Sequence, residues 1–528
     1  MDGEADDRTP GPLGRVKVAL GLLLGLRPHD LGAARTFMAT AYPSVSTPVA
    51  LLRFAGWVAG QAFGTIPNAL TTVSFARHVS RTSVWLASEN PVANHPWATR
   101  PDAELPRQVE VAVIGAGFTG SACAYHWSKH GGGPMAVLEM NEAASGASGR
   151  NEGLVVMGRF FAYVKRTMRQ DLDRTRDNLS PDQRDLLSSR FADAYVRSAY
   201  RNADLIEATV RDEGFQCDYT REGWIQAGDG AAQGDLRESV RLGEEAGFDD
   251  WTSLEPAEVL EHGGMAVDHP AGFSRRTASW HPARWVWSLL HVALRSDNVE
   301  LFTNTRVLGI DDLGDHYLVR TERGDVRATY VVNATESYSA ILHPRLQNVL
   351  HAVQTQAAFA DGGPASMKAG VGLGGGNGWF GRVANGTIFG SDATRVSYKK
   401  AGRNRPSRFV TRFLVGEMRR YFGPGNMRVT REWSCTAGFT DDEYPIVGLL
   451  DGKRQYIVAG MCGSGSAVHF NGARHVVQHI LGLDGPDDYP AEFFSPTRVL
   501  DPANHTWPSV DAQPTASADP HDRRSAPL

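Results

Sequence analysis

The chain has 528 residues, of which 42% are hydrophobic and 21% are charged, and it carries a formal net charge of −5. This length exceeds what one hydrophobic core supports, so we expect at least two domains, and the composition excludes a disordered or fibrous chain. The negative charge gives no general attraction to nucleic acid. The four scattered cysteines show no metal-ligand spacing, so we expect no metal site, and they fit a reducing compartment.

Residues 1–107 are predicted to form an N-terminal extension and linker. Between residues 15 and 81, seven Arg or Lys residues stand against the single acid Asp30. The charge-free stretch 54–76 is long enough to span a bilayer, but glycines, Pro67 and polar side chains dilute it, so we expect no transmembrane helix. Two interpretations remain. We prefer a helical extension packed on the body or on a partner, and the alternative is a basic segment lying on an anionic membrane surface. The protein is accordingly expected in the cytoplasm, with peripheral membrane contact through residues 15–81 as the alternative.

The next segment carries the pattern of a dinucleotide-binding turn. An apolar run over 109–114, typical of a buried parallel strand, leads directly into Gly115, Gly117 and Gly120, in G-x-G-x-x-G spacing. In such a turn the first glycine permits the tight bend. The second admits a pyrophosphate close to the backbone, and the third lets the following helix pack on the strand.

A helix over 118–130 and a second apolar strand over 135–140 complete this unit. The helix begins with Phe118 and Thr119, where backbone N–H groups and the positive end of the helix dipole face the phosphates. Glu139 lies 19 residues past the last glycine, where a carboxylate accepts hydrogen bonds from ribose hydroxyls and disfavours a 2′-phosphate. NADP is therefore disfavoured, whereas the motif alone leaves NAD and FAD open.

A glycine-rich loop, SGASGRNEG at 145–153, follows the second strand. Small residues such as Ser148 and Gly149 allow the backbone to approach a ligand closely. Because Arg150 and Asn151 are embedded in the loop, we interpret it as a polar binding loop rather than a flexible connection.

The rest of the chain alternates helical and strand-like patterns. Residues 159–279 are largely helical, and an amphipathic helix over 280–295 precedes three strand-like runs that end near residue 335. Strand-like runs separated by glycines over 349–432 predict an antiparallel sheet. A second glycine turn at 460–465 precedes another helix, and residues 485–528 form a Pro- and Asp-rich tail that is predicted to be partly disordered.

Four segments, in this order, resemble the D-amino-acid-oxidase-like superfamily of FAD-dependent oxidoreductases, and within it the gamma-glutamylputrescine oxidoreductase and glycine/sarcosine oxidase type. The matching segments are SGASGRNEG, VVNATESY at 331–338, WSCTAGFTDDEYPIVG at 433–448 and GMCGSG at 460–465. The resemblance covers residues 84–484. It implies an α/β fold with a Rossmann-like FAD-binding domain (108–158, 280–348 and 433–484) and an α+β substrate domain with an antiparallel sheet (159–279 and 349–432).

The resemblance implies that FAD is the cofactor and that a C–N bond of a small amine or amino acid is oxidised by hydride transfer to flavin N5. It places the backbone of Val307 at the adenine, with Ala334 and Thr335 closing the FAD domain. Arg150 is our candidate for a positive charge near the flavin or a substrate carboxylate, and Gln354 for the substrate wall. The predicted cofactor-binding residues are Gly115, Gly117, Phe118, Thr119, Gly120, Glu139, Ser148, Gly149, Arg150, Asn151, Val307, Ala334, Thr335, Cys435, Gly460, Gly463, Ser464 and Gly465.

Three positions bear on the type of flavoenzyme. Cys435 stands where monomeric sarcosine oxidase carries its flavin-linking cysteine, so a covalent thioether is a hypothesis. Its alternative is a small buried apolar residue. Ser464 replaces a histidine that is common in the family. Ile388 replaces the lysine that promotes reaction with oxygen in monomeric sarcosine oxidase, which leaves a dehydrogenase open.

Two functions of other classes remain as alternatives. One is a non-catalytic flavin-binding protein anchored to a membrane or a partner through its basic extension. The other is a flavoenzyme that modifies the wobble uridine of tRNA, against which the net charge of −5 argues. The sequence indicates neither the particular substrate nor the oligomeric state.

Overall fold

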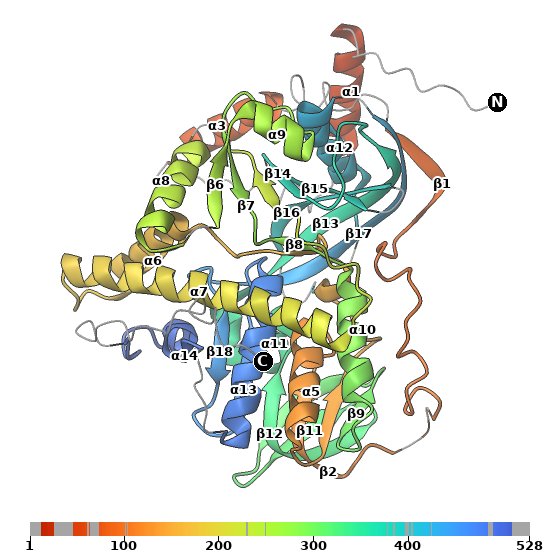
Figure 1. Cartoon of the computed structure of the whole chain (residues 1–528), viewed down its shortest axis with the longest axis vertical. Coiled ribbons are helices and arrows are strands. Elements are labelled where there is room, and N and C mark those ends of the chain that lie inside the picture. Colours follow the sequence, from red (N-terminus) through yellow and green to blue (C-terminus); the bar gives the residue numbers. More distant parts are fainter. Residues whose placement is uncertain are drawn as a thin grey trace, which may run out of the picture.

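A computed structural model shows two large sheets arranged along the long axis of the molecule, with helix α7 (Pro181–Glu213) lying across that axis between them (Figure 1). A two-stranded sheet pairs β4 (Leu154–Val155) with β8 (Ala278–Ser279). Helix α7 begins at a capping box in which Ser180 accepts a hydrogen bond from the backbone N–H of Gln183. The structure describes residues 12–25, 46–60, 63, 73–100, 102, 104–228, 231–248, 250–376, 378–383, 386–396, 401–402, 405–423, 425–483 and 489–508.

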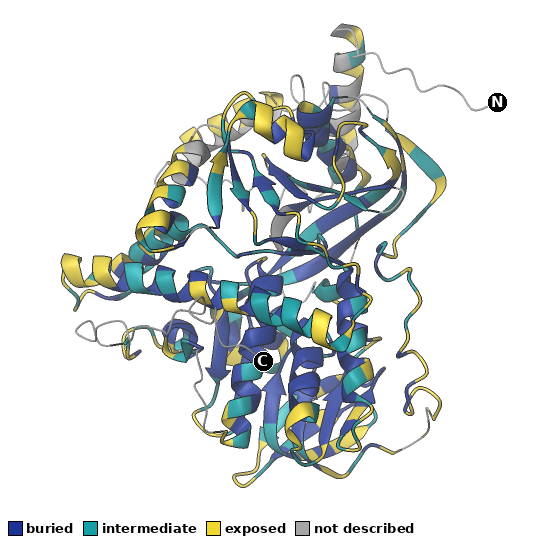
Figure 2. Ribbon diagram, viewed as in Figure 1, coloured by how far each residue is buried: buried dark blue, intermediate teal, exposed yellow. Residues whose placement is uncertain are grey.

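The lower sheet in Figure 1 has eight strands and confirms the Rossmann-like expectation. Its parallel strands run in the order β19 (Gln455–Ala459), β12 (Gly324–Asn333), β2 (Gln108–Ile114), β3 (Met135–Leu138) and β9 (Val299–Phe302). Antiparallel strands β10 (Val307–Asp312), β11 (Tyr317–Thr321) and β18 (Ile446–Leu449) extend it. Apart from Gln108 and Glu110 of β2, strands β2 and β3 consist of apolar residues that are buried, as expected for the middle of a parallel sheet (Figure 2).

Three helices pack side by side against this sheet. Helix α5 (Phe118–His130) lies between α10 (Pro282–Ala293) and α13 (His469–Leu481). Their facing surfaces are apolar, with Trp127, Trp285 and Phe470 fully or almost fully buried. This packing holds the N-terminus of α5 rigidly at the end of β2, where the ligand of a dinucleotide fold binds.

The upper sheet has nine strands and is mainly antiparallel, as expected for the second domain. In order, its strands are β1 (Ser74–Ser80), β17 (Asn426–Thr440), β13 (Leu350–Gly363), β16 (Gly386–Val396), β15 (Gly378–Val383), β14 (Gly372–Gly375), β5 (Trp224–Gln226), β7 (Ala271–Ser274) and β6 (Trp251–Leu254). Helices α6 (Phe161–Thr175), α8 (Ala231–Glu245), α9 (Pro256–Gly263) and α12 (Arg408–Phe422) complete this half. Strand β17 pairs with β13 along its whole length.

The described residues of the N-terminal segment form two helices and one strand. Helices α1 (Pro12–Gly25) and α3 (Thr47–Gly60) confirm a helical extension, while β1 pairs in parallel with β17 at the sheet edge. None of the described helices is long and apolar enough to cross a membrane. Much of the apolar stretch 54–76 lies outside the described residues. On α1 the side chains of Leu13, Leu20 and Leu24 are exposed.

The C-terminal segment folds back onto the body through the short helices α14 (Ala491–Phe494) and α15 (Thr497–Leu500). Phe494 is buried against Tyr489 and Phe191 of α7, and Arg498 reaches the loop after β17. The disorder predicted for the tail falls after residue 508, outside the described residues.

Candidate functional site

The dinucleotide turn lies between β2 and α5 and leaves no room for larger residues. Gly115 has φ +102°, and a Cβ atom there would lie 2.8 Å from the carbonyl oxygen of Ala334. A Cβ at Gly120 would lie 1.8 Å from the Gly115 carbonyl oxygen. At Gly117 it would lie 2.8 Å from Ser148 Oγ. Gly115 and Gly120 therefore leave no room for a side chain, as a tight turn requires, while the approach of a pyrophosphate at Gly117 stays a prediction.

Glu139, just beyond the end of β3, lies beside this turn. The side chain is buried, and its Oε2 accepts a hydrogen bond from Ala116 N at 2.8 Å while Oε1 accepts one from Asn141 N at 2.9 Å. Burial raises the pKa of the carboxyl, whereas these backbone N–H groups act in the opposite direction. Since each carboxylate oxygen has a further lone pair, Glu139 can still accept from ribose hydroxyls.

The neighbouring strands bring further predicted residues to the same place. The Thr305 N–H donates to the carbonyl of Glu139 at 2.8 Å, which sets Val307 at the start of β10 close by. The Ala334 N–H donates to the carbonyl of Ile114 at 3.0 Å, so the end of β12 closes over Gly115.

The 145–153 loop folds over the start of α5. Ser148 Oγ accepts from the N–H of Phe118 at 2.8 Å, in the first turn of the helix. The side chain of Asn151 donates to the carbonyl of Ser148 at 2.9 Å and accepts from the N–H of Gly153 at 2.9 Å, so it shapes the loop from within. The N-terminal extension also fixes this loop. Ser83 Oγ donates to the carbonyl of Gly149 at 2.5 Å, a contact that the sequence did not indicate.

Arg150 and Cys435, both predicted site residues, lie near each other. The Arg150 carbonyl accepts a hydrogen bond from Trp433 Nε1 at 2.9 Å, and Cys435 is two residues further along β17, on the same face. Burial lowers the pKa of the Arg150 guanidinium, partly offset by nearby Cys435 and Tyr338. The guanidinium Nε donates to the carbonyl of Ser145 at 2.9 Å, and no carboxylate lies within ion-pair distance of it in the described part of the chain.

Gln354 lies on the other face of the same sheet. Its amide donates to Ser434 Oγ at 3.1 Å, while the adjacent Thr355 contacts Cys435 Sγ at 2.9 Å. Because successive side chains of a strand point to opposite faces, Gln354 faces away from Arg150 and Cys435. Its role in the substrate wall stays a prediction.

The second glycine turn connects β19 to α13 and docks on the end of β17. Gly460 and Gly463 have φ +65° and +85°, and the Cys462 N–H donates to the carbonyl of Gly438 at 2.9 Å. In the described part of the chain, the N–H groups of Gly463 and Gly465 donate to no backbone carbonyl. These groups are free to meet the acceptors of a bound ring, and with the dinucleotide turn they form a cradle that fits FAD.

Two charged residues at this turn were missed from the sequence. Arg159 Nη1 lies 2.5 Å from Glu443 Oε2, and its Nη2 donates to the carbonyl of Cys462 at 3.4 Å. Glu336, directly after Thr335, accepts a hydrogen bond from the N–H of Met461 at 2.7 Å. Nothing in the spacing of the sequence singles out either residue, because both partners lie more than 120 positions away.

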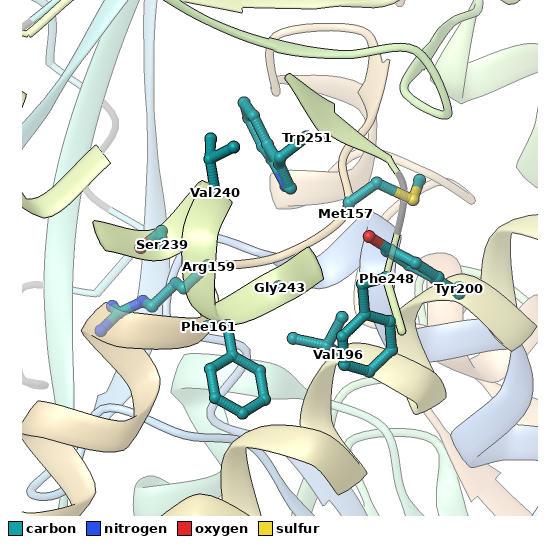
Figure 3. A pocket seen from close by; sticks show the side chains of 10 residues that line it. All are labelled: Met157, Arg159, Phe161, Val196, Tyr200, Ser239, Val240, Gly243, Phe248 and Trp251. Atoms are coloured by element: carbon teal, nitrogen blue, oxygen red, sulfur yellow. The ribbon is translucent and has the colours of Figure 1, made fainter. Parts of the chain in front are cut away.

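A small cavity lies between α7, α8 and the loop that carries Arg159 (Figure 3). Its volume of about 10 Å³ holds one water molecule at most, so it is not a substrate site. In Figure 3 the side chain of Arg159 points away from Phe248 and Val196, consistent with its pairing to Glu443. The lining residues are Met157, Arg159, Phe161, Val196, Tyr200, Ser239, Val240, Gly243, Phe248 and Trp251.

Comparison with known proteins agrees with this geometry. A family model described as FAD dependent oxidoreductase (DAO) matches residues 110–479. L-proline dehydrogenase from P. horikoshii superposes with a TM-score of 0.61 at 18% identity, over 75% of this chain and 98% of that one. Glycine oxidase from Geobacillus kaustophilus superposes with a TM-score of 0.59 at 17% sequence identity, over 74% of this chain and 99% of that one. L-amino acid deaminase from Proteus vulgaris, lacking its specific insertion sequence, superposes with a TM-score of 0.55 at 19% sequence identity, over 74% of this chain and 94% of that one. No curated protein matches the chain.

Proposed function

Because the chain belongs to the DAO family of FAD-dependent oxidoreductases, we propose that it oxidises a C–N bond of an amino acid or a related small amine. The observation that carries the substrate class is the half-buried guanidinium of Arg150, which has no carboxylate partner in the described part of the chain and lies beside β17. A buried cation without a counter-ion favours an anionic ligand, and the carboxylate of an amino acid supplies one.

Different residues of the chain would hold different parts of the cofactor. The dinucleotide turn and the N-terminus of α5 would bind the pyrophosphate, Glu139 the ribose, and the N–H groups of Gly463 and Gly465 the ring. FAD, when bound, supplies the hydride acceptor of the reaction, so the protein needs no acid–base pair of its own. Arg150 would orient the substrate, and the apolar surroundings of Trp433 would exclude water.

Ile388 bears on whether oxygen is the acceptor that reoxidises the flavin. This side chain is buried and belongs to the same apolar cluster as Trp433 and Ala357. A cation at this position in a related enzyme promotes reaction with oxygen, and an isoleucine cannot supply that charge. We therefore propose a dehydrogenase, or a slow oxidase, rather than a fast oxidase.

The test uses the purified full chain under anaerobic conditions. Bleaching of the flavin by an amino acid, but not by the corresponding 2-hydroxy acid, supports the proposal. In Arg150→Ala the KM for the amino acid should rise about tenfold or more, while the KM for the decarboxylated amine should change little. FAD occupancy is measured alongside. Bleaching by no amine or amino acid would favour a non-catalytic flavoprotein, and uridine-dependent activity on tRNA would favour the third hypothesis.

A further inference from the structure

Glu336 adopts a backbone conformation that its residue type rarely tolerates. It follows β12 with φ +52°, in the left-handed region where glycine and asparagine are favoured. A glutamate persists in such a conformation only when its surroundings require it, and unusual backbone of this kind gathers at functional sites.

The contacts of the carboxyl group explain why the backbone is held there. Oε1 accepts from the N–H of Met461 at 2.7 Å, and Oε2 is fully enclosed. A Cβ atom at Gly438 would lie 2.3 Å from Oε2, so the strand beside it must carry a glycine. The carboxyl group thus fills the junction between β17 and the second glycine turn.

Several bonds hold that turn, among them the contacts of Arg159 with the Cys462 carbonyl and of the Thr440 N–H with Cys462 Sγ. Within the described residues, Met461 N donates to Glu336, Cys462 N to the carbonyl of Gly438 at 2.9 Å, and Ser464 N to the carbonyl of Met461 at 2.8 Å. None of these bonds uses the N–H groups of Gly463 and Gly465. Two residues before Glu336, Ala334 closes over Gly115, so one short segment contacts both glycine turns.

We propose that Glu336 is a positioning residue for FAD, whose carboxyl group holds residues 460–465 so that their free N–H groups meet the flavin ring. The proposal rests on the binding of FAD and not on the identity of the substrate. It requires Oε1 as an acceptor for Met461 N, which a glutamine supplies equally well and which glycine or asparagine does not.

The test compares Glu336→Gly, Glu336→Asn and Glu336→Gln in the full chain, with FAD affinity, the visible flavin spectrum and the melting temperature of the apoprotein as readouts. Glu336→Gly and Glu336→Asn relieve the backbone conformation but lose the acceptor. We expect apoprotein melting temperatures close to that of the wild type, a Kd for FAD about tenfold or more higher, and a flavin spectrum closer to that of free FAD. Glu336→Gln should bind FAD within about threefold of the wild type, with a protein-bound spectrum.

Asp218→Gly is the matched control, because Asp218 also has a positive φ of +53° but lies outside both glycine turns. It should leave FAD affinity unchanged. Wild-type affinity and spectrum in Glu336→Gly or Glu336→Asn would overturn the proposal, as would an equal loss in Glu336→Gln. If Glu336→Gly does not fold, Glu336→Asn decides, because asparagine suits the backbone but is too short to reach Met461. None of these measurements uses a substrate, so failure to find an oxidised amine leaves their outcome intact.

Discussion

Arg498 and Asp442 form a fully buried ion pair, with Nε 2.5 Å from Oδ2 and side chains only 1% and 2% exposed. Arg498 also donates to the backbone carbonyls of Phe493, Tyr444 and Pro445. It lies beyond residues 110–479, which match the family, and it secures the loop after β17 from the outside.

Removing one partner of this pair should destabilise the fold strongly. Arg498→Met leaves the Asp442 carboxylate buried without its counter-charge, which typically costs about 3–5 kcal/mol of unfolding free energy. Chemical denaturation monitored by tryptophan fluorescence measures the change. The control is Arg211→Ala, which removes an exposed arginine paired with Asp212 and should alter the midpoint little. A denaturation midpoint for Arg498→Met equal to that of the wild type would contradict the assignment.

Glu139→Ala should weaken FAD retention by about 1–3 kcal/mol, or about 5- to 150-fold in Kd, because a charge-assisted hydrogen bond to the ribose is lost. The variant also leaves the N–H groups of Ala116 and Asn141 without their acceptor, so the apoprotein should melt at a lower temperature. Glu139→Gln keeps an acceptor and separates the two effects. Titration with FAD, followed by quenching of flavin fluorescence, gives the affinities. Unchanged retention in Glu139→Ala would count against the role.

The thioether hypothesis for Cys435 has a direct test. The thiol is buried beside Arg150, and such a bond requires it to react as the thiolate. If the bond forms, acid precipitation leaves yellow colour and the flavin mass in the protein pellet, and Cys435→Ser releases both. Flavin found only in the supernatant of the wild-type protein ends the hypothesis.

Removal of residues 1–72 should leave a folded protein that retains FAD, because a chain beginning at Val73 keeps β1 and the Ser83–Gly149 contact. A chain that begins at Ser83 lacks β1 and should be less stable. Sedimentation with anionic vesicles then tests the membrane alternative, since the full chain should bind and the Ser83 chain, which lacks residues 15–81, should not. Equal sedimentation of the full chain and the Ser83 chain would exclude that role.

Glu336 should also make stability depend on pH. Burial raises the pKa of its carboxyl from 4.5 to about 7, against the effect of the N–H groups of Met461 and Gly438. In the folded state the carboxyl keeps its proton up to a higher pH than in the unfolded chain. This contribution is therefore fully present below about pH 4.5 and is lost as the pH rises through about 7. The stability of the wild type relative to Glu336→Gln should fall over that range and become constant above it. A pH-independent difference would contradict the shift.

The sequence predicted the parts of this fold whose signals are local. The glycine spacing at Gly115–Gly120 and the apolar strands around it depend on short-range geometry, so the turn lies where it was expected. Glu139 follows from a fixed distance along the same unit. The pairing of β1 with β17 was not predicted, since parallel pairing at a sheet edge depends on residues more than 340 positions apart.

The site was predicted less completely than the fold. The resemblance assigned Arg150 and Cys435 separately to the flavin, and only the structure shows that they are neighbours. The orientation of Gln354 depends on strand register, which a sequence pattern does not fix. Glu336 and Arg159 owe their importance to backbone groups of the second glycine turn. Every residue has such backbone groups, so no sequence motif identifies these contacts, and only the structure shows them.

Strand β17 belongs to the upper sheet, yet between Trp433 and Gly438 it is hydrogen-bonded to the lower half. Trp433 donates to the carbonyl of Arg150, the Thr436 carbonyl accepts from Ser337, and the Gly438 carbonyl accepts from Cys462. A rotation that separates the upper half from the lower half would break all three hydrogen bonds at once. We therefore expect molecules to enter and leave the proposed site by local movement of loops or side chains, without separation of the two halves.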